Sequence, residues 1–153
     1  MFLYLVQHAE AKPESEDPQR GLSERGMKDI KKVASFIGKL NLQVDEILQS
    51  GKLRARQTAG VLAEALKVKV SETDGLAPLD NPEIWADRLK NTNKSIMLVG
   101  HLPHLNYLAS ILLCGSKEKN IVSFRMGGVV CLKKENGNWS IKWMITPEII
   151  PED

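Results

Sequence analysis

The chain has 153 residues, with 42% hydrophobic and 26% charged residues, which is ordinary for a globular protein with one core. Its 21 basic and 19 acidic residues give a net charge of +2 without a basic block, which argues against nucleic-acid binding as the main role. The apolar run at residues 2–6 is too short for a signal peptide or a membrane span. We therefore expect one cytoplasmic domain over residues 1–153, without membrane association.

The first half of the chain alternates between strand-like and helix-like segments. The apolar run 2–6 predicts a strand buried on both faces. Residues 22–40 place apolar side chains on one helical stripe, from Met27 to Leu40, with Ser23 as the expected N-cap. The same reasoning predicts a strand at 45–50, a helix at 53–66 and a strand at 68–73.

The second half continues the alternation and then changes character. A helix is expected over 81–90, with Asn81 as its cap, a strand over 95–100, and a further helix after Pro103. Residues 128–146 contain two strand-like runs around an Asn-Gly pair, which predicts a β-hairpin. On its second strand, four apolar residues are expected on one face: Trp139, Ile141, Trp143 and Ile145.

This order of elements predicts an α/β fold, specifically a three-layer αβα sandwich. The central sheet should be mostly parallel and should end in the C-terminal hairpin. Ligands of such sheets bind beyond the carboxyl ends of the strands. The residues that follow the predicted strands are therefore the candidates for a functional site.

Two of the three histidines and one arginine follow predicted strands. His8 follows the first strand, His101 follows the strand at 95–100, and Arg54 opens the helix after the second strand. A single histidine at a strand end is usually structural, but this combination indicates a shared anionic site. Imidazole is a nucleophile, and guanidinium matches phosphate oxygens, so the residue types favour phosphoryl transfer. A protonated His101 would add a second positive donor.

Other chemistries have weaker support. His101 and His104 are three residues apart, but no cysteine or carboxylate lies near them in sequence, so no metal site is predicted and His104 is expected on a helix surface. Cys114 and Cys131 lack Cys-x-x-Cys spacing and are expected to be reduced core thiols. The sequence also lacks a Gly-x-Ser-x-Gly elbow and a Gly-rich nucleotide loop.

Four segments in order, "LVQHAEA", "RGLSERG", "SGKLRARQTA" and "VGHLPHL", resemble the histidine phosphatase (phosphoglycerate mutase-like) superfamily. The short chain is most similar to its SixA-type phosphohistidine phosphatases, which lack large lid insertions. The resemblance implies that His8 is a nucleophile that accepts the phosphoryl group, that Arg54 clamps the phosphate and that His101 completes the pocket. It implies that Arg20 reaches the phosphate from a loop, with a solvated loop arginine as the alternative. No cofactor or metal is implied.

The sequence departs from the family pattern in its first motif. Gln7-His8-Ala9 stands where the family has Arg-His-Gly, and Gly51 replaces a proline. Gln7 can still donate an amide hydrogen bond to a phosphate, but losing a cationic donor to the transition state costs about 2–4 kcal/mol. The residue that protonates the leaving group is left open between Glu10 and Asp80.

Three functional hypotheses follow. The first is a phosphohistidine phosphatase that forms a phosphohistidine intermediate on His8, with reduced activity because Gln7 is uncharged. Its partner would be a phosphorylated protein. The second is a catalytically degenerate module that binds phosphate or a phosphoprotein. The third is a phosphatase or phosphoramidase of small phosphorylated substrates.

Overall fold

The structure is a computed structural model that describes residues 1–152. Its elements, in chain order, are β1 (Phe2–Gln7), α1 (Glu24–Gly38), β2 (Glu46–Gln49), α2 (Leu53–Leu66), β3 (Val70–Glu72), α3 (Glu83–Lys90), β4 (Ile96–Gly100), α4 (His104–Cys114), β5 (Val129–Glu135), β6 (Asn138–Ile145) and the 3-10 turn η1 (Pro147–Ile149). Each helix and strand predicted from the sequence is present, with bounds shifted by a few residues.

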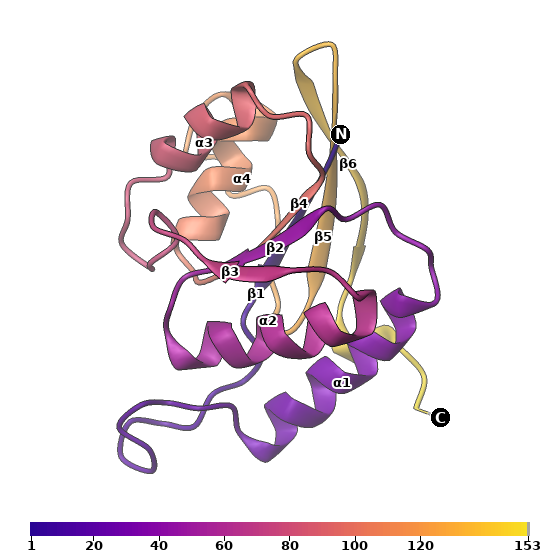
Figure 1. Cartoon of the computed structure of the whole chain (residues 1–153). Coiled ribbons are helices and arrows are strands. Elements are labelled where there is room, and N and C mark those ends of the chain that lie inside the picture. The colour runs from indigo at the N-terminus through magenta and orange to yellow at the C-terminus, as the bar shows by residue number, and fades with distance from the viewer. Residues whose placement is uncertain (153) are drawn as a thin grey trace.

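Within residues 1–152, six strands form one sheet in the order β3-β2-β4-β1-β5-β6 (Figure 1). The first four in this order run parallel, and β5 and β6 add antiparallel to the far side of β1. β1 and β4 occupy the middle, and their apolar residues are buried on both faces, as expected for central parallel strands. The predicted mostly parallel sheet with a C-terminal hairpin is confirmed.

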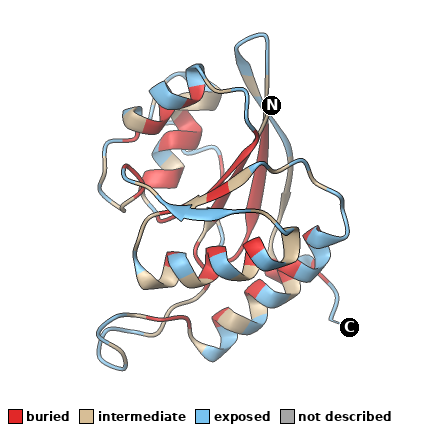
Figure 2. Ribbon diagram, viewed as in Figure 1, coloured by how far each residue is buried: buried red, intermediate tan, exposed pale blue. Residues whose placement is uncertain are grey.

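Helices cover both faces of this sheet and make the predicted three layers (Figures 1 and 2). One core lies under α1 and α2 and contains Ile30, Val33 and Leu62. A second core lies under α3 and α4 and contains Leu89 and Leu105. Alternate residues of β1 point into the two cores, so β1 is held from both sides and its carboxyl end is fixed in place.

The helix predicted at 22–40 is shorter than its apolar stripe suggested. Ser23 is its N-cap, as predicted, and accepts a hydrogen bond from the Gly26 backbone N–H at 3.0 Å. The helix ends at Gly38, and Leu40 lies beyond it and is exposed. The capped end faces the carboxyl end of the sheet, because the Ser23 N–H donates to the Glu10 carbonyl at 2.9 Å.

The hairpin forms as predicted, but its face assignment is wrong. Asn136 and Gly137 adopt positive φ angles of 52° and 78°, which the tight turn requires. A register shift opposite Cys131 and Leu132 then leaves β6 with one extra residue. Such a bulge moves later side chains to the other face, so Trp139 packs on the α3–α4 side and Trp143 on the α1–α2 side.

Two further expectations can be compared with the described part of the chain. Cys131 is buried, as expected of a core thiol, whereas Cys114 is exposed near the end of α4, which corrects the prediction for that residue. None of the described helices is long and apolar enough to cross a membrane.

Candidate active site

The parallel pairing of β1 and β4 brings the two strand-end histidines together. Gln7 is opposite Gly100 in the register, so the next residues, His8 and His101, are neighbours at the same edge. The His8 backbone N–H donates to the Gly100 carbonyl at 3.0 Å, and the centroids of the two rings are 5.1 Å apart. The sequence predicted this juxtaposition, because both histidines follow strands of one parallel sheet.

His8 is held as a neutral imidazole with one free nitrogen. Its Nδ1 donates to the Ala9 carbonyl at 2.7 Å, and because a carbonyl can only accept, this contact places the proton on Nδ1. Burial lowers the pKa of His8, and the positive charges of Arg54 and Arg20 lower this pKa further against the opposing effect of the Ala9 carbonyl. Nε2 therefore keeps a lone pair for nucleophilic attack.

His101 is also neutral, so it does not add the positive donor that a protonated ring would supply. It is 1% exposed, and burial lowers its pKa to about 3, with the positive charges of neighbouring residues acting in the same direction. Its Nε2 is 2.6 Å from the Ser50 hydroxyl at the end of β2. This contact orients the ring, and Ser50 was not singled out from the sequence.

Two arginines converge on the histidines. Arg54 lies in the first turn of α2, and burial together with the charge of Arg20 lowers its pKa. Within residues 1–152, neither arginine forms an ion pair with a carboxylate, and the buried Nε of Arg54 has no hydrogen-bond partner. Two like charges held together without a counter-charge favour an anion between them.

The loop that presents Arg20 is tied to α2 and to itself. Arg20 has a φ of 53°, and its Nε donates to the Lys12 carbonyl at 3.1 Å. The Asp17 carboxylate accepts from the Gly21 N–H at 2.9 Å, and the Gln57 side chain accepts from the Leu22 N–H at 2.7 Å. These contacts fix the loop, and the charge of Arg20 lowers the pKa values of His8 and Arg54.

Thr58 links the segment that follows β1 to the first turn of α2. Its hydroxyl accepts from the Ala9 N–H at 3.0 Å and donates to the Arg54 carbonyl at 2.7 Å. One buried side chain thus sets the distance between the segment that carries His8 and the turn that carries Arg54.

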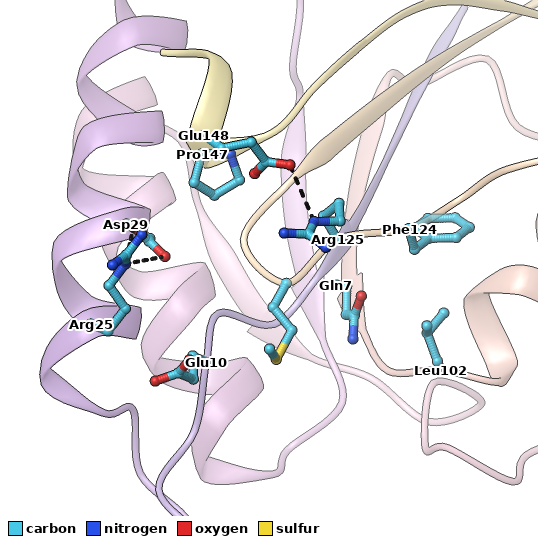
Figure 3. A pocket seen from close by; sticks show the side chains of 10 residues that line it. Gln7, Glu10, Arg25, Asp29, Leu102, Phe124, Arg125, Pro147 and Glu148 are labelled. Carbon is cyan, nitrogen blue, oxygen red and sulfur yellow. Dashed lines mark hydrogen bonds and ion pairs between the residues drawn. The ribbon is translucent and has the colours of Figure 1, made fainter. Parts of the chain in front are cut away.

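Gln7 lies beside this cluster and faces a cavity of about 410 Å³ (Figure 3). The lining residues are Gln7, Glu10, Arg25, Asp29, Leu102, Phe124, Arg125, Met126, Pro147 and Glu148. The Gln7 side chain is one of those that line this cavity. The structure thus leaves Gln7 next to the predicted site and adds a cavity that the sequence did not reveal.

His104 and Asp80 were also considered from the sequence, and the structure shows the surroundings of both. His104 is completely buried, which corrects its assignment to a helix surface, and burial lowers its pKa although the nearby Asp80 carboxylate opposes this effect. Asp80 accepts a hydrogen bond from the Ala77 N–H at 2.9 Å. Among the described residues, no group of three side chains could hold a metal ion.

The lowered histidine pKa values predict a loss of stability on acidification. The folded chain lowers the pKa values of His8, His101 and His104, whereas in the unfolded chain each takes up a proton near pH 6.5. Their contribution is therefore present above about pH 6.5 and is lost as the pH falls below it. Each proton bound only by the unfolded chain lowers the free energy of unfolding by about 1.4 kcal/mol per pH unit.

Urea unfolding at pH 7.5, 6.5 and 5.5 measures this effect, because this range lies above the usual pKa values of carboxyl groups. The midpoint should fall between pH 6.5 and 5.5 much more than between 7.5 and 6.5. A constant midpoint would show that the buried histidines accept protons in the folded chain.

Comparisons with known proteins identify the family of this chain. Residues 3–88 match the model of the histidine phosphatase superfamily (branch 1), whose members are phosphatases. The chain is 33% identical over 141 residues to an uncharacterised protein of Picosynechococcus, with 87% of this chain and 85% of that protein covered. It is 23% identical over 154 residues to the phosphohistidine phosphatase SixA of Escherichia coli K12, with 96% and 94% covered.

The fold is also similar to a solved structure of the protein histidine phosphatase SixA complexed with tungstate. The TM-score is 0.83, the identity is 22%, and the similarity covers 96% of this chain and 97% of that one. This structural likeness establishes the fold, and the family match extends over more than half of the sequence. The chain belongs to the histidine phosphatase superfamily.

Proposed function

We propose that this chain is a phosphohistidine phosphatase that passes the phosphoryl group through His8. The observation that carries the proposal is a neutral His8, with its proton fixed on Nδ1, beside two arginines that lack carboxylate partners. Such a site suits a reaction in which catalysis consists mostly of positioning and charge stabilisation. The solved SixA structure is complexed with tungstate, a tetrahedral oxyanion like phosphate, which supports a phosphate ligand for a chain of this fold.

In the proposed reaction, His8 Nε2 attacks phosphorus and forms a P–N bond while the bond to the leaving group breaks. The electron pair of the broken bond stays with the leaving group. Arg54 and Arg20 would balance the charge on the phosphoryl oxygens, and Ser50 would hold His101 against them. Water then attacks phosphorus, releases inorganic phosphate and returns His8 to its neutral form.

A phosphorylated imidazole is the substrate that best tolerates Gln7. A phosphoramidate bond is labile, so it needs less charge stabilisation than a phosphate ester. A substrate of this kind can react even where the family's arginine is replaced by an uncharged amide. The similarity to SixA of Escherichia coli, which is named a phosphohistidine phosphatase, supports the same substrate class.

The alternative function is a module that binds phosphate or a phosphoprotein without turnover, and the uncharged Gln7 favours it.

One experiment distinguishes the phosphatase from the binding module. The wild type is incubated with a protein-borne phosphohistidine substrate, and both acid-labile phosphate on the chain and free phosphate are followed. Transient label on the peptide that contains His8, with release of phosphate, supports the enzyme. Binding without label or release in the wild type, together with turnover by Gln7→Arg, would establish the module.

A further inference from the structure

A cavity of about 410 Å³ lies next to the two histidines and is bounded by their neighbours in sequence. Gln7 precedes His8, Leu102 follows His101, and the side chains of both Gln7 and Leu102 line the cavity (Figure 3). A phosphoryl group held between His8 and Arg54 would carry its leaving group toward this space. The charges that line the cavity would then act on the leaving group.

Four of the five charged side chains that line the cavity form two ion pairs. Arg25 Nε is 3.2 Å from Asp29 Oδ1, both on α1, and Arg125 Nε is 3.2 Å from Glu148 Oε1 (Figure 3). The second pair joins the segment before β5 to the η1 turn. Each arginine is thus matched by a carboxylate, and neither pair gives the cavity a net charge.

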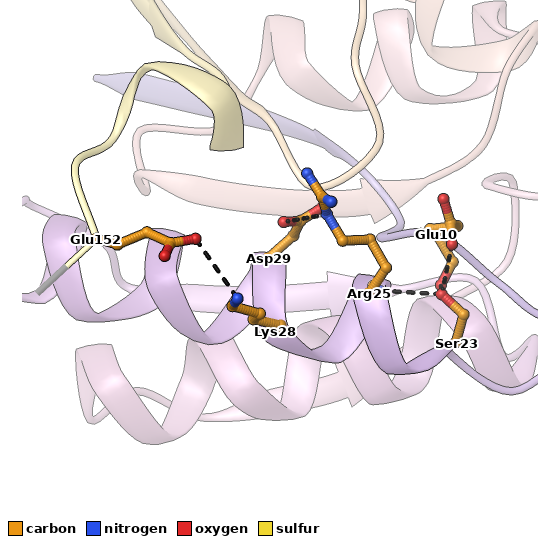
Figure 4. Close-up of polar contacts among 7 residues, drawn as sticks. Glu10, Ser23, Arg25, Lys28, Asp29 and Glu152 are labelled. Carbon is orange, nitrogen blue, oxygen red and sulfur yellow. Dashed lines mark hydrogen bonds and ion pairs between the residues drawn. The ribbon is translucent and has the colours of Figure 1, made fainter.

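Glu10 is the fifth charged residue of the cavity lining, and it belongs to neither ion pair. Its Oε1 accepts a hydrogen bond from the Ser23 hydroxyl at 2.7 Å, which is a neutral donor (Figure 4). Within residues 1–152, Glu10 forms no ion pair with a basic side chain. The cavity therefore carries one uncompensated negative charge, only two residues along the chain from His8.

We propose that Glu10 makes this site select leaving groups that are neutral or positively charged and reject anionic ones. The proposal rests on the phosphatase function, because it assigns the cavity to the leaving group. The site then has two ends of opposite sign, with Arg54 and Arg20 at the phosphate end and Glu10 at the other. A phosphorylated imidazolium or ammonium matches both ends, whereas a phosphate ester that carries a carboxylate matches only the first.

The uncharged side chain of Gln7 contributes to this selectivity. An arginine at this position would bring into the cavity a positive charge that compensates Glu10, whereas the amide leaves the negative charge unopposed. A phosphohistidine ring that carries a proton on its second nitrogen would be stabilised there. When the P–N bond breaks, the ring keeps the electron pair and departs as neutral imidazole, so no further proton is needed.

Two phosphonates of similar length test the selectivity without any turnover. 2-Aminoethylphosphonate carries an ammonium group and 2-carboxyethylphosphonate a carboxylate, and the Kd of each can be measured by isothermal titration calorimetry. We expect the wild type to bind the ammonium compound roughly tenfold more tightly, because attraction and repulsion at a partly exposed charge each contribute up to about fivefold.

The variant Glu10→Gln keeps an oxygen that can accept from Ser23 and should reduce the ratio of the two Kd values to within about twofold. Gln7→Arg should reduce it similarly, and Glu14→Gln, which changes an exposed carboxylate of the neighbouring loop, should leave it at the wild-type value. Equal Kd values in the wild type, or a preference that survives Glu10→Gln, would overturn the proposal. Because calorimetry detects binding alone, these outcomes are distinct from a failure to label His8.

Discussion

Replacing His8 with alanine is expected to abolish both phosphoryl transfer to the chain and release of phosphate. Turnover should fall by roughly 10⁴-fold or more, because the variant lacks the atom that forms the intermediate. We expect no other ring to take its place, because the Nε2 of His101 is 2.6 Å from the Ser50 hydroxyl and His104 is completely buried. The measurement is acid-labile phosphate on the chain together with the rate of phosphate release.

The His8→Ala variant also distinguishes chemistry from folding. The backbone N–H of residue 8 still donates to the Gly100 carbonyl, and Arg54 and Arg20 are unchanged, so the variant should still fold and bind orthovanadate. A variant that keeps its thermal transition and binds the oxyanion, but takes up no label, supports His8 as the nucleophile. Persistent label in a folded His8→Ala protein would disprove the assignment.

Arg54→Ala is expected to reduce kcat/KM by about 100- to 1000-fold. This corresponds to about 2–4 kcal/mol of lost transition-state stabilisation at a half-buried cationic donor. The matched control is Arg56→Ala, because Arg56 lies on the same helix two residues away but is exposed. Its kcat/KM should stay within about twofold of the wild type.

The free energy of unfolding of Arg54→Ala checks this prediction independently of activity. Arg54 has no carboxylate partner within residues 1–152 and is repelled by Arg20, so its removal should change the free energy of unfolding by no more than about 1 kcal/mol. Arg54→Lys keeps the charge without the planar fork and should recover only part of the lost activity. If Arg54→Ala loses stability in proportion to activity, the residue supports the fold and does not clamp phosphate.

The elements and the central pair of histidines were predictable because their signals are local. Continuous apolar runs identify buried strands, the spacing of Met27, Ile30 and Val33 identifies an amphipathic helix, and Ser23 marks where that helix begins. Parallel strands end at one edge, so the positions of His8 and His101 in sequence were enough to predict that they meet.

Other features depend on contacts between segments far apart in sequence. Thr58 joins Ala9 to Arg54, and Ser50 contacts His101 across two strands, but neither residue differs in type from many ordinary helix or loop residues. His104 was expected on a helix surface, yet the packing of α4 buries it completely. The bulge in β6 overrides a regular alternation that the sequence displays clearly.

By itself, the sequence of this protein determined the order of its strands and helices and the residue types at the strand ends, because periodicity and end signals act over a few residues. Only the tertiary structure decided which charges remain uncompensated. Arg54 and Arg20 lack a counter-charge at one end of the site, and Glu10 lacks one at the other, within the part of the chain that the structure describes. The reason is that electrostatic pairing depends on distance in space, and the fold sets that distance.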